Sequence, residues 1–387
     1  MRLLHTSDWH LGRRLHGEDL LEHQARFLDW LLLTARSERV DAVLVSGDIY
    51  DRVQPPAEAV SLLDETLGAF AAAGVRLVIS SGNHDSAVRL QYGGAVMAPA
   101  GVHVRTTLAG ASEPVILADE HGALGIYAVP FLLPDAVCTE LGVPRTHEAV
   151  LREVAARIRV DAAERGLTRT VVMAHAFVTG GTVSESERDI RVGGVADAPA
   201  AVFDGATFVA LGHLHGPQQV RLAGSATVLQ YSGSPLAFSF SEAGQVKSVT
   251  LVELDAQGVA MTERIATPVP RPLREVRGRL GELLRRASAD LADLSEAWVK
   301  VVLTDPGRVA RPMQQLRHVW PHTVALAFEP ERDGQGPLAL PHVGESIDPV
   351  EICAQFLQAV SGSEPTQTQR DLVAVAVAEC RGAEAVA

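Results

Sequence analysis

Carboxylate, amide and imidazole side chains recur in five short motifs, and together they could bind metal ions. The motifs are Asp8-Trp9-His10, Gly47-Asp48, Gly82-Asn83-His84-Asp85, His175 and Gly212-His213-Leu214-His215. Ligands of these types suit Mn²⁺, Fe²⁺ or Zn²⁺, and the lack of thiolate among them argues against a structural zinc site. The sequence therefore predicts a catalytic metal centre, as opposed to a structural one.

The size of this ligand set predicts two metal ions. It contains seven side chains: Asp8, His10, Asp48, Asn83, His175, His213 and His215. Two ions about 3.5–4 Å apart share a bridging carboxylate, for which Asp48 is the candidate. Such a pair binds opposite sides of a phosphate and lowers the pKa of a shared water, so the set indicates phosphoester hydrolysis. A lone histidine is more often packed or solvated, so the prediction depends on all five motifs.

Each of the five motifs follows a predicted β-strand. Strands are expected at 2–6, 42–45, 77–80, 170–174 and 207–210. Helical patterns at 18–35 and 57–72 separate the first three strands, which predicts a βαβαβ unit with a parallel or mixed sheet. Sites in open α/β sheets lie beyond the carboxyl ends of the strands, so the five loops are expected to converge.

The rest of the chain predicts a second sheet and two smaller parts. The segment 218–265 is rich in β patterns and is expected to form the second sheet. Alternating prolines at 267–272 cannot continue a helix or an inner strand, so they mark a linker, and 331–344 resembles a second linker. We therefore expect domains at 1–266, 273–330 and 345–382, the last being a pair of short helices.

Composition is typical of a folded protein and limits how the chain could hold nucleic acid. It has 387 residues, 47% hydrophobic and 21% charged, with a net charge of −13. Proteins that hold nucleic acid by neutralising phosphates are normally basic, so any binding of DNA must depend on something other than the net charge of this chain. The three cysteines form neither a disulfide framework nor a metal motif. The longest apolar run, 123–133, contains Pro130 and is too short to cross a bilayer, so a cytoplasmic protein is expected.

The order of the five motifs resembles that of the calcineurin-like metallophosphoesterases. Longer segments narrow the resemblance to the nuclease subunits of bacterial SbcCD complexes: His5–Gly12, Ser184–Arg188, Ala210–His215, Tyr231–Leu236 and Ser239–Glu242. The resemblance covers the first 255 residues strongly. It implies an α/β fold in which a two-sheet sandwich is flanked by helices, followed by a small α+β capping domain and a C-terminal helix pair.

The resemblance also implies a role for each candidate residue. One ion would be held by Asp8, His10, Asp48 and His215, and the other by Asp48, Asn83, His175 and His213. His84 would face the scissile phosphate without binding metal, because an imidazole there can stabilise the departing sugar oxygen. Asp85 would orient His84, with a direct catalytic role as the alternative. Archaeal and eukaryotic relatives carry a histidine three residues after the bridging aspartate, where this chain has Asp51, which removes one candidate for steering DNA.

The implied activity is that of a manganese-dependent DNA nuclease at the nucleoid, in DNA repair and recombination. It would be an ATP-dependent 3′→5′ double-strand exonuclease and a single-strand and hairpin endonuclease. The chain has no Gly-Lys dipeptide and hence no Walker-type phosphate loop, so an SbcC-type ATPase would hydrolyse ATP, in a complex with two copies of each chain. The C-terminal helices would dock on that partner or on the nuclease domain. Arg188 and Arg191 could touch phosphates, although a solvated loop is the simpler interpretation.

Two other classes of function stay open from the sequence. A phosphatase or cyclic-nucleotide phosphodiesterase could use the same metal centre, although it needs neither a capping domain nor a helix pair. The second class is a non-catalytic interaction subunit, although such a protein would not need the whole ligand set together with His84.

Overall fold

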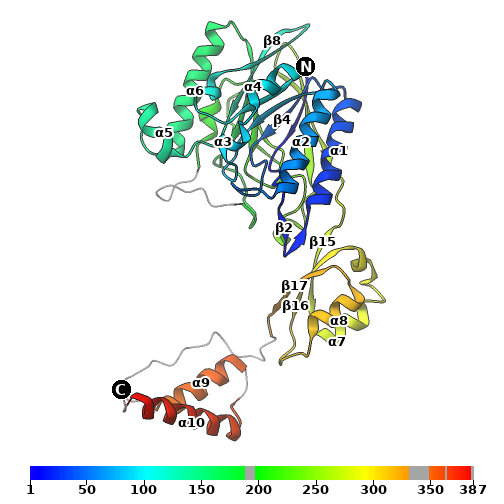
Figure 1. Cartoon of the computed structure of the whole chain (residues 1–387), viewed down its shortest axis with the longest axis vertical. Helices are drawn as coiled ribbons and strands as arrows, with labels where there is room; N and C mark the ends of the chain where they lie inside the picture. The colour runs from blue at the N-terminus through cyan, green and yellow to red at the C-terminus, as the bar shows by residue number, and fades with distance from the viewer. Residues whose placement is uncertain (188–196, 331–347, 362–363, 385–387) are drawn as a thin grey trace. The chain divides into compact units, whose positions relative to one another are not determined.

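The computed structural model describes residues 1–187, 197–330, 348–361 and 364–384. Arg188, Arg191 and the linker predicted at 331–344 lie outside these ranges. The chain divides into two compact units, Met1–Leu273 and Arg274–Ala387 (Figure 1). The division of the second unit into a capping domain and a helix pair stays a prediction.

The first sheet of the first unit has six strands, in the order β14-β13-β1-β4-β5-β6. Their bounds are Arg2–Thr6 for β1, Ala42–Ser46 for β4, Arg76–Ser80 for β5, Val102–Arg105 for β6, Ser248–Leu254 for β13 and Val259–Ala266 for β14. The strands β1, β4, β5 and β6 are parallel, as the βαβαβ pattern predicts. The two late strands β13 and β14 extend this sheet in antiparallel fashion beside β1.

The second sheet also has six strands, in the order β11-β12-β10-β9-β8-β7. Their bounds are Val115–Asp119 for β7, Gly122–Val129 for β8, Arg169–His175 for β9, Phe208–Gly212 for β10, Gln218–Val220 for β11 and Val228–Tyr231 for β12. The expectation that 218–265 forms the second sheet is therefore wrong in part. Only β11 and β12 of that segment join it, because β13 pairs with β1 of the first sheet.

The two sheets face each other and helices cover their outer faces, which gives four layers. Leu44, Val78, Met173 and Phe208 pack in the core between the sheets. Helices α1 (Leu21–Ser37) and α2 (Ala57–Ala72) cover the first sheet, and α5 (Pro134–Leu141) and α6 (His147–Glu164) cover the second (Figure 1). Helix α1 buries Phe27, Leu28 and Leu31, which recur at the spacing of one helix face.

The first helix begins three residues later than its apolar pattern predicts. Glu18 and Asp19 form the short strand β3, which pairs with β2 (Arg14–Leu15). The two residues between them, His16 and Gly17, both have positive φ angles. Such a two-residue turn closes a hairpin, and it keeps residues 18–19 out of the helix.

The second unit begins with a small sheet covered by short helices and ends with two longer helices. The sheet orders β15 (Leu273–Gly278), β16 (Trp298–Leu303) and β17 (Thr323–Phe328), and α7 (Leu280–Arg286) and α8 (Pro312–Val319) pack on it around Trp320. Helices α9 (Pro349–Ser361) and α10 (Gln367–Glu384) contact each other through Arg370 and Glu351, at 3.3 Å. Within the described ranges, no helix is both long and apolar enough to cross a bilayer.

Candidate metal centre

The seven predicted ligands lie where the carboxyl edges of the two sheets meet. Asp8 and His10 follow β1, Asp48 follows β4 and Asn83 follows β5, all in the first sheet; His175 ends β9, and His213 and His215 follow β10, in the second sheet. Hydrogen bonds join the two groups of loops. The His213 N–H donates to both Asp8 carboxylate oxygens at 3.1 Å, and His175 Nδ1 donates to Ser46 O at 2.9 Å. The rule for a single open sheet thus explains only three of the five loops.

Four of these ligand positions have a left-handed backbone. The φ angles are 56° at Asp8, 46° at His10, 52° at Asp48 and 103° at His213. Non-glycine residues in this region cost about 1–3 kcal/mol each and persist only where the surroundings enforce them. Here the loops are fixed to one another, because the Asp8 N–H donates to Gly47 O and the His10 N–H to Asp48 O, both at 3.0 Å.

One side of the site brings together Asp8, His10 and His215. His10 Nε2 lies 3.2 Å from His215 Nε2 and 3.6 Å from Asp48 Oδ2. One ligand atom each of Asp8, His10 and His215 lie within 4.8 Å of one another. Two ring nitrogens that face each other can share only one hydrogen, so a cation between them suits this geometry.

The other side brings together Asn83, His175 and His213. His175 Nε2 lies 2.9 Å from Asn83 Oδ1 and 3.5 Å from Asp48 Oδ2, and the His213 ring packs beside the His175 ring at 5.4 Å. Because His175 Nδ1 donates to Ser46 O, a neutral His175 directs its Nε2 lone pair at these two oxygens. Oxygen and nitrogen lone pairs that converge in this way fit a divalent cation. Which ion each ligand holds stays a prediction.

Asp48 occupies the middle of the site. Its Oδ2 atom is 3.6 Å from His10 Nε2 and 3.5 Å from His175 Nε2, which belong to opposite sides. Its Oδ1 atom accepts the His84 N–H at 2.9 Å. This position is the one that a bridging carboxylate needs.

Burial sets the charge states of the ligands. Burial raises the pKa of Asp8, and the nearby charge of Asp48 raises it further. Burial lowers the pKa of His10, His175 and His213, so the neutral imidazole is the favoured form of each. Neutral imidazoles and two carboxylates that repel each other make a strong site for cations, because bound cations offset that repulsion.

His84 faces the same site but has a different partner from the one expected. Its Nδ1 donates to Asp51 O at 2.6 Å, and its ring packs against the His10 ring at 4.7 Å. The expectation that Asp85 orients His84 is therefore wrong, since the Asp51 carbonyl takes that place. A ring nitrogen of His84 also lies within 4.8 Å of ligand atoms of His10 and Asp48, so the ring is close enough to bind metal.

Asp85 instead holds two of the metal-binding loops together. Its carboxylate accepts the N–H groups of Ile49 at 3.1 Å, Tyr50 at 2.9 Å and Gly82 at 2.8 Å. A carboxylate at this position satisfies backbone donors from the turns after β4 and β5 at once. Burial and the charge of Asp48 raise the pKa of Asp85 to about 7, although the three hydrogen bonds oppose this.

Sequence reasoning missed several residues that contact the ligands. Asp51 Oδ1 lies 3.8 Å from His10 Nδ1 and 3.3 Å from Arg13 Nη1. Ser186 Oγ lies 2.6 Å from His215 Nδ1, and Glu242 Oε1 lies 3.6 Å from the same atom. Glu242 stood within a segment that carried the family resemblance, but no local spacing indicated what it touches.

The charge of Glu242 follows from its neighbours. Burial alone would raise the pKa of Glu242, but the contact with His215 and the charge of Lys247 outweigh burial and lower it to about 2. For Lys247 the balance is reversed, since burial lowers its pKa more than the charge of Glu242 raises it.

Comparison with known proteins agrees with the fold and with the use of divalent metal ions. The calcineurin-like phosphoesterase family matches residues 1–217, and the family described as type 5 capsule protein repressor C-terminal domain matches residues 269–361. The SbcD subunit of nuclease SbcCD from Bacillus subtilis (strain 168) is 31% identical over 94% of this chain and 99% of the relative. The Staphylococcus saprophyticus protein of the same name is also 31% identical, over 84% of each chain.

The chain therefore belongs to the calcineurin-like phosphoesterases, and within them to the SbcD family of SbcCD nuclease subunits. Its fold is the two-sheet α/β sandwich of that class, and it is a metal-dependent phosphodiester hydrolase that uses divalent metal ions.

Proposed function

We propose that the chain is the nuclease subunit of an SbcCD-like complex that acts on DNA. Its activities would be an ATP-dependent 3′→5′ double-strand exonuclease and a single-strand and hairpin endonuclease, in the cytoplasm at the nucleoid. The observation that carries this proposal is the convergence of seven candidate ligands from two sheets, with Asp48 in the middle of them. The names of the two relatives, both nuclease subunits, support DNA as the substrate.

The ligand assignments follow from the two sides of the site. Asp8, His10 and His215 would hold one ion and Asn83, His175 and His213 the other, with Asp48 shared between them. Two divalent ions, proposed to be Mn²⁺, would neutralise the phosphate and provide an activated water. Carboxylate, amide and imidazole ligands without thiolate support Mn²⁺ over softer ions.

His84 would act on the departing oxygen. Because its Nδ1 donates to the Asp51 carbonyl, Nε2 is the ring atom left to meet a substrate. Asp51 fixes the direction of the ring, and the contact of the His84 N–H with Asp48 fixes the backbone beside the site. In its imidazolium form, with a hydrogen on each ring nitrogen, a histidine placed in this way can give the Nε2 proton to the leaving sugar oxygen.

The partners are proposed from the exposed surfaces. In the C-terminal helices, Phe356, Leu372 and Val375 are exposed, which supports docking of residues 345–382 on an SbcC-type ATPase. The partner would supply both ATP hydrolysis and part of the binding of DNA, because the chain itself has a net charge of −13. The unit at 273–330 would be the capping domain.

A homodimer within a two-plus-two complex is supported by a second exposed surface. Val88, Tyr92 and Val96 are 85%, 88% and 82% exposed. They lie in and between the short helices α3 (Ala87–Leu90) and α4 (Gly94–Met97), which follow His84 and Asp85 in the sequence. A second copy of the chain would cover these apolar side chains.

The direct test is hydrolysis of end-labelled linear duplex DNA in Mn²⁺ by the purified chain and by His84→Gln. We expect His84→Gln to lose activity by about 10²–10⁴-fold while binding as many Mn²⁺ ions as the wild type. His121→Gln, in the turn between β7 and β8, is the matched control and should keep full activity. Loss of a bound ion in His84→Gln would show instead that His84 is a ligand.

The alternative function is hydrolysis of small phosphomonoesters, phosphodiesters or cyclic nucleotides at the same metal centre. Assays of the wild type on bis-p-nitrophenyl phosphate and on DNA, with and without the ATPase partner, separate the two. Cleavage of DNA, alone or with the partner, supports the nuclease. Hydrolysis of the small ester with intact DNA under both conditions would overturn it in favour of the alternative.

A further inference from the structure

Two buried charged side chains lie behind His215 and take no part in the ligand set. Glu242 is 0% exposed and Lys247 is 2% exposed. Lys247 is also one of only two lysines in the sequence. Removing an ion from water into a protein interior is costly, so such a pair needs close partners.

Lys247 fixes Glu242 and the backbone of His215 in one arrangement. Its Nζ donates to His215 O at 2.9 Å, to Ser234 Oγ at 3.0 Å and to Gln245 Oε1 at 2.9 Å, and it forms a short ion pair with Glu242 Oε2. The other oxygen of Glu242 is directed at Ser186 Oγ. The carboxylate therefore bridges a lysine on one side and the hydroxyl beside the His215 ring on the other.

The directions of the hydrogen bonds define the tautomer of His215. Ser186 has one hydroxyl hydrogen, and it donates that hydrogen to Glu242 Oε1, which can only accept. Ser186 Oγ must then accept in its 2.6 Å contact with His215 Nδ1, so Nδ1 carries the ring hydrogen. His215 Nε2 is left with a lone pair directed into the metal centre, 3.2 Å from His10 Nε2.

A second contact fixes the backbone of the same histidine. Glu187 Oε1 accepts the His215 N–H at 2.7 Å, and its other oxygen accepts Ser184 Oγ at 2.8 Å. The segment 184–187 thus holds both the ring and the main chain of His215 from one direction, and Lys247 holds its carbonyl oxygen from the other.

We propose that Ser186 and Glu242 are positioning residues for His215, and that Lys247 keeps Glu242 in place. Partners of this kind fix the tautomer and the ring direction of a metal-binding histidine. The inference rests on the proposed function, since it assigns the network to the ion that His215 would hold. It predicts that breaking the network weakens one of the two metal sites and spares the other.

The test is calorimetric titration of the full chain with Mn²⁺, which needs no nuclease activity. Two variants break the network: Ser186→Ala, and the double variant Glu242→Gln with Lys247→Met, which removes both buried charges so that neither is left unpaired. In each we expect one Mn²⁺ site to weaken by about 10–100-fold while the other keeps its wild-type affinity. Ser186→Thr keeps the hydroxyl and should bind both ions as the wild type does.

Asp119→Asn is the control for a general loss of stability, because it breaks an ion pair with Arg169, which lies at the opposite end of β9 from His175. It should unfold more easily and still bind both ions normally. Wild-type affinity at both sites in Ser186→Ala and in the folded double variant would overturn the inference. A wild-type chain that fails to bind two Mn²⁺ ions would overturn the proposed metal centre itself, which is a different result.

Discussion

Gly82 and Gly212 determine how closely the metal-binding loops approach each other. A Cβ atom at Gly212 would lie 1.8 Å from Ser46 O, in the facing sheet, and one at Gly82 would lie 2.1 Å from Asp48 Oδ1. The Ser46 carbonyl belongs to a paired strand, so it cannot give way unless the sheets separate. Glycine is required at both positions because there is no room for a Cβ atom.

We expect Gly212→Ala to lower the free energy of unfolding by about 3 kcal/mol and to abolish tight binding of Mn²⁺, because the added methyl group overpacks the contact between the sheets. Urea unfolding and Mn²⁺ titration measure the two effects. The matched control is Gly68→Ala in α2, where a Cβ meets no atom within 4 Å. It should gain about 0.5–1 kcal/mol from helix propensity. Normal metal binding by Gly212→Ala would contradict the expectation.

The convergence of the candidate ligands could be predicted from the sequence because each of them stands at or just after the end of an apolar strand. Strand ends and residue types are local signals, so Asp8, Asp48 and His175 needed no knowledge of the packing. Asp51 and Glu242 could not be predicted in this way. Their contacts with His10 and His215 join segments 41 and 27 residues apart, respectively, and depend on how side chains meet in the folded site.

At the scale of elements, helix α1 positions the first metal-binding loop through one buried glutamine. Gln24 Nε2 donates to Trp9 O at 3.1 Å and to His10 O at 2.7 Å, and Gln24 Oε1 accepts the Gly12 N–H at 3.0 Å. The side chain is almost fully buried. It thereby takes the place of the backbone partners that a loop of left-handed residues lacks.

We expect Gln24→Met to destabilise the protein by about 1–3 kcal/mol and to weaken Mn²⁺ binding, because the Trp9 carbonyl and the Gly12 N–H lose the partner that Gln24 gives them, while the His10 carbonyl keeps the Arg13 N–H. Glu22→Gln on the exposed side of the same helix is the control, and it should stay within about 0.5 kcal/mol of the wild type. Chemical unfolding and metal titration serve both variants. If Gln24→Met binds metal as tightly as the wild type, the loop is fixed by other contacts.

The elements themselves followed from apolar periodicity where that signal was strong. The helix at 57–72 is confirmed with the predicted bounds. Pairing between distant strands could not be predicted in this way. The apolar pattern indicates that β13 and β14 are strands, but it does not indicate which sheet they join. The place of β13 beside β1 depends on contacts between residues about 250 positions apart.

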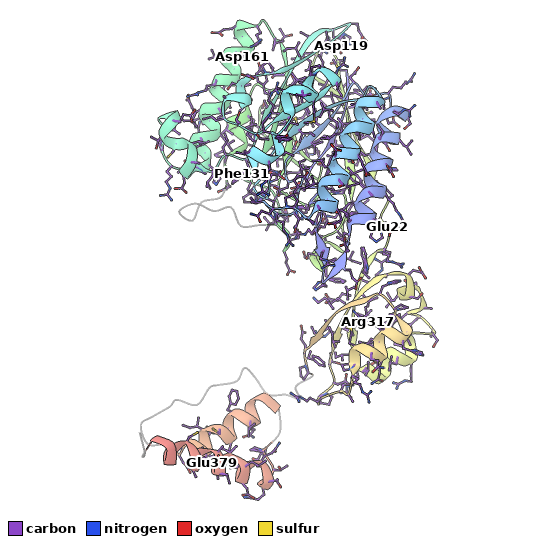
Figure 2. The ribbon with its side chains drawn as sticks, in the orientation of Figure 1. Glu22, Asp119, Phe131, Asp161, Arg317 and Glu379 are labelled. Atoms are coloured by element: carbon purple, nitrogen blue, oxygen red, sulfur yellow. The ribbon has the colours of Figure 1, made fainter. Side chains whose placement is uncertain are left out.

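At the scale of the whole first unit, a second buried cluster lies at the edge of the sheets opposite the metal centre. Arg169, which begins β9, donates to Asp119 at 3.2 Å, to Gly122 O at 2.6 Å and to Asp255 O at 3.4 Å. Gly122 belongs to the second sheet, while Asp255 follows β13 of the first sheet. In Figure 2, Asp119 lies at the upper end of this unit and Phe131, whose ring contacts His175, lies lower down.

This cluster predicts a pH dependence of stability. The Arg169 guanidinium holds the pKa of Asp119 well below its usual range, even though burial opposes this. A lowered pKa in the folded state adds stability that is present above the usual pKa of about 3.9 and is lost as the pH falls below it. At neutral pH we expect the free energy of unfolding of Asp119→Asn to be about 3 kcal/mol lower than that of the wild type.

The difference between wild type and Asp119→Asn should shrink when unfolding is measured at pH 6, 4 and 3. It should be largest at pH 6, where the wild-type carboxylate is ionised in both the folded and the unfolded state. A difference that is constant over this range would mean that Asp119 contributes through its shape and not through its charge.

The division of the metal ligands between two sheets has a consequence for the survival of the protein in the cell. An ion held by Asp8 and His215, or by Asn83 and His175, would take ligands from both sheets and could bind only after the sheets have docked. Any ligand that binds only the folded state adds to stability, by about 2.7 kcal/mol when its concentration is a hundred times its Kd. The supply of metal would then determine how long a newly made chain resists proteolysis. A shortage of the ion would lower the amount of the enzyme as well as its activity.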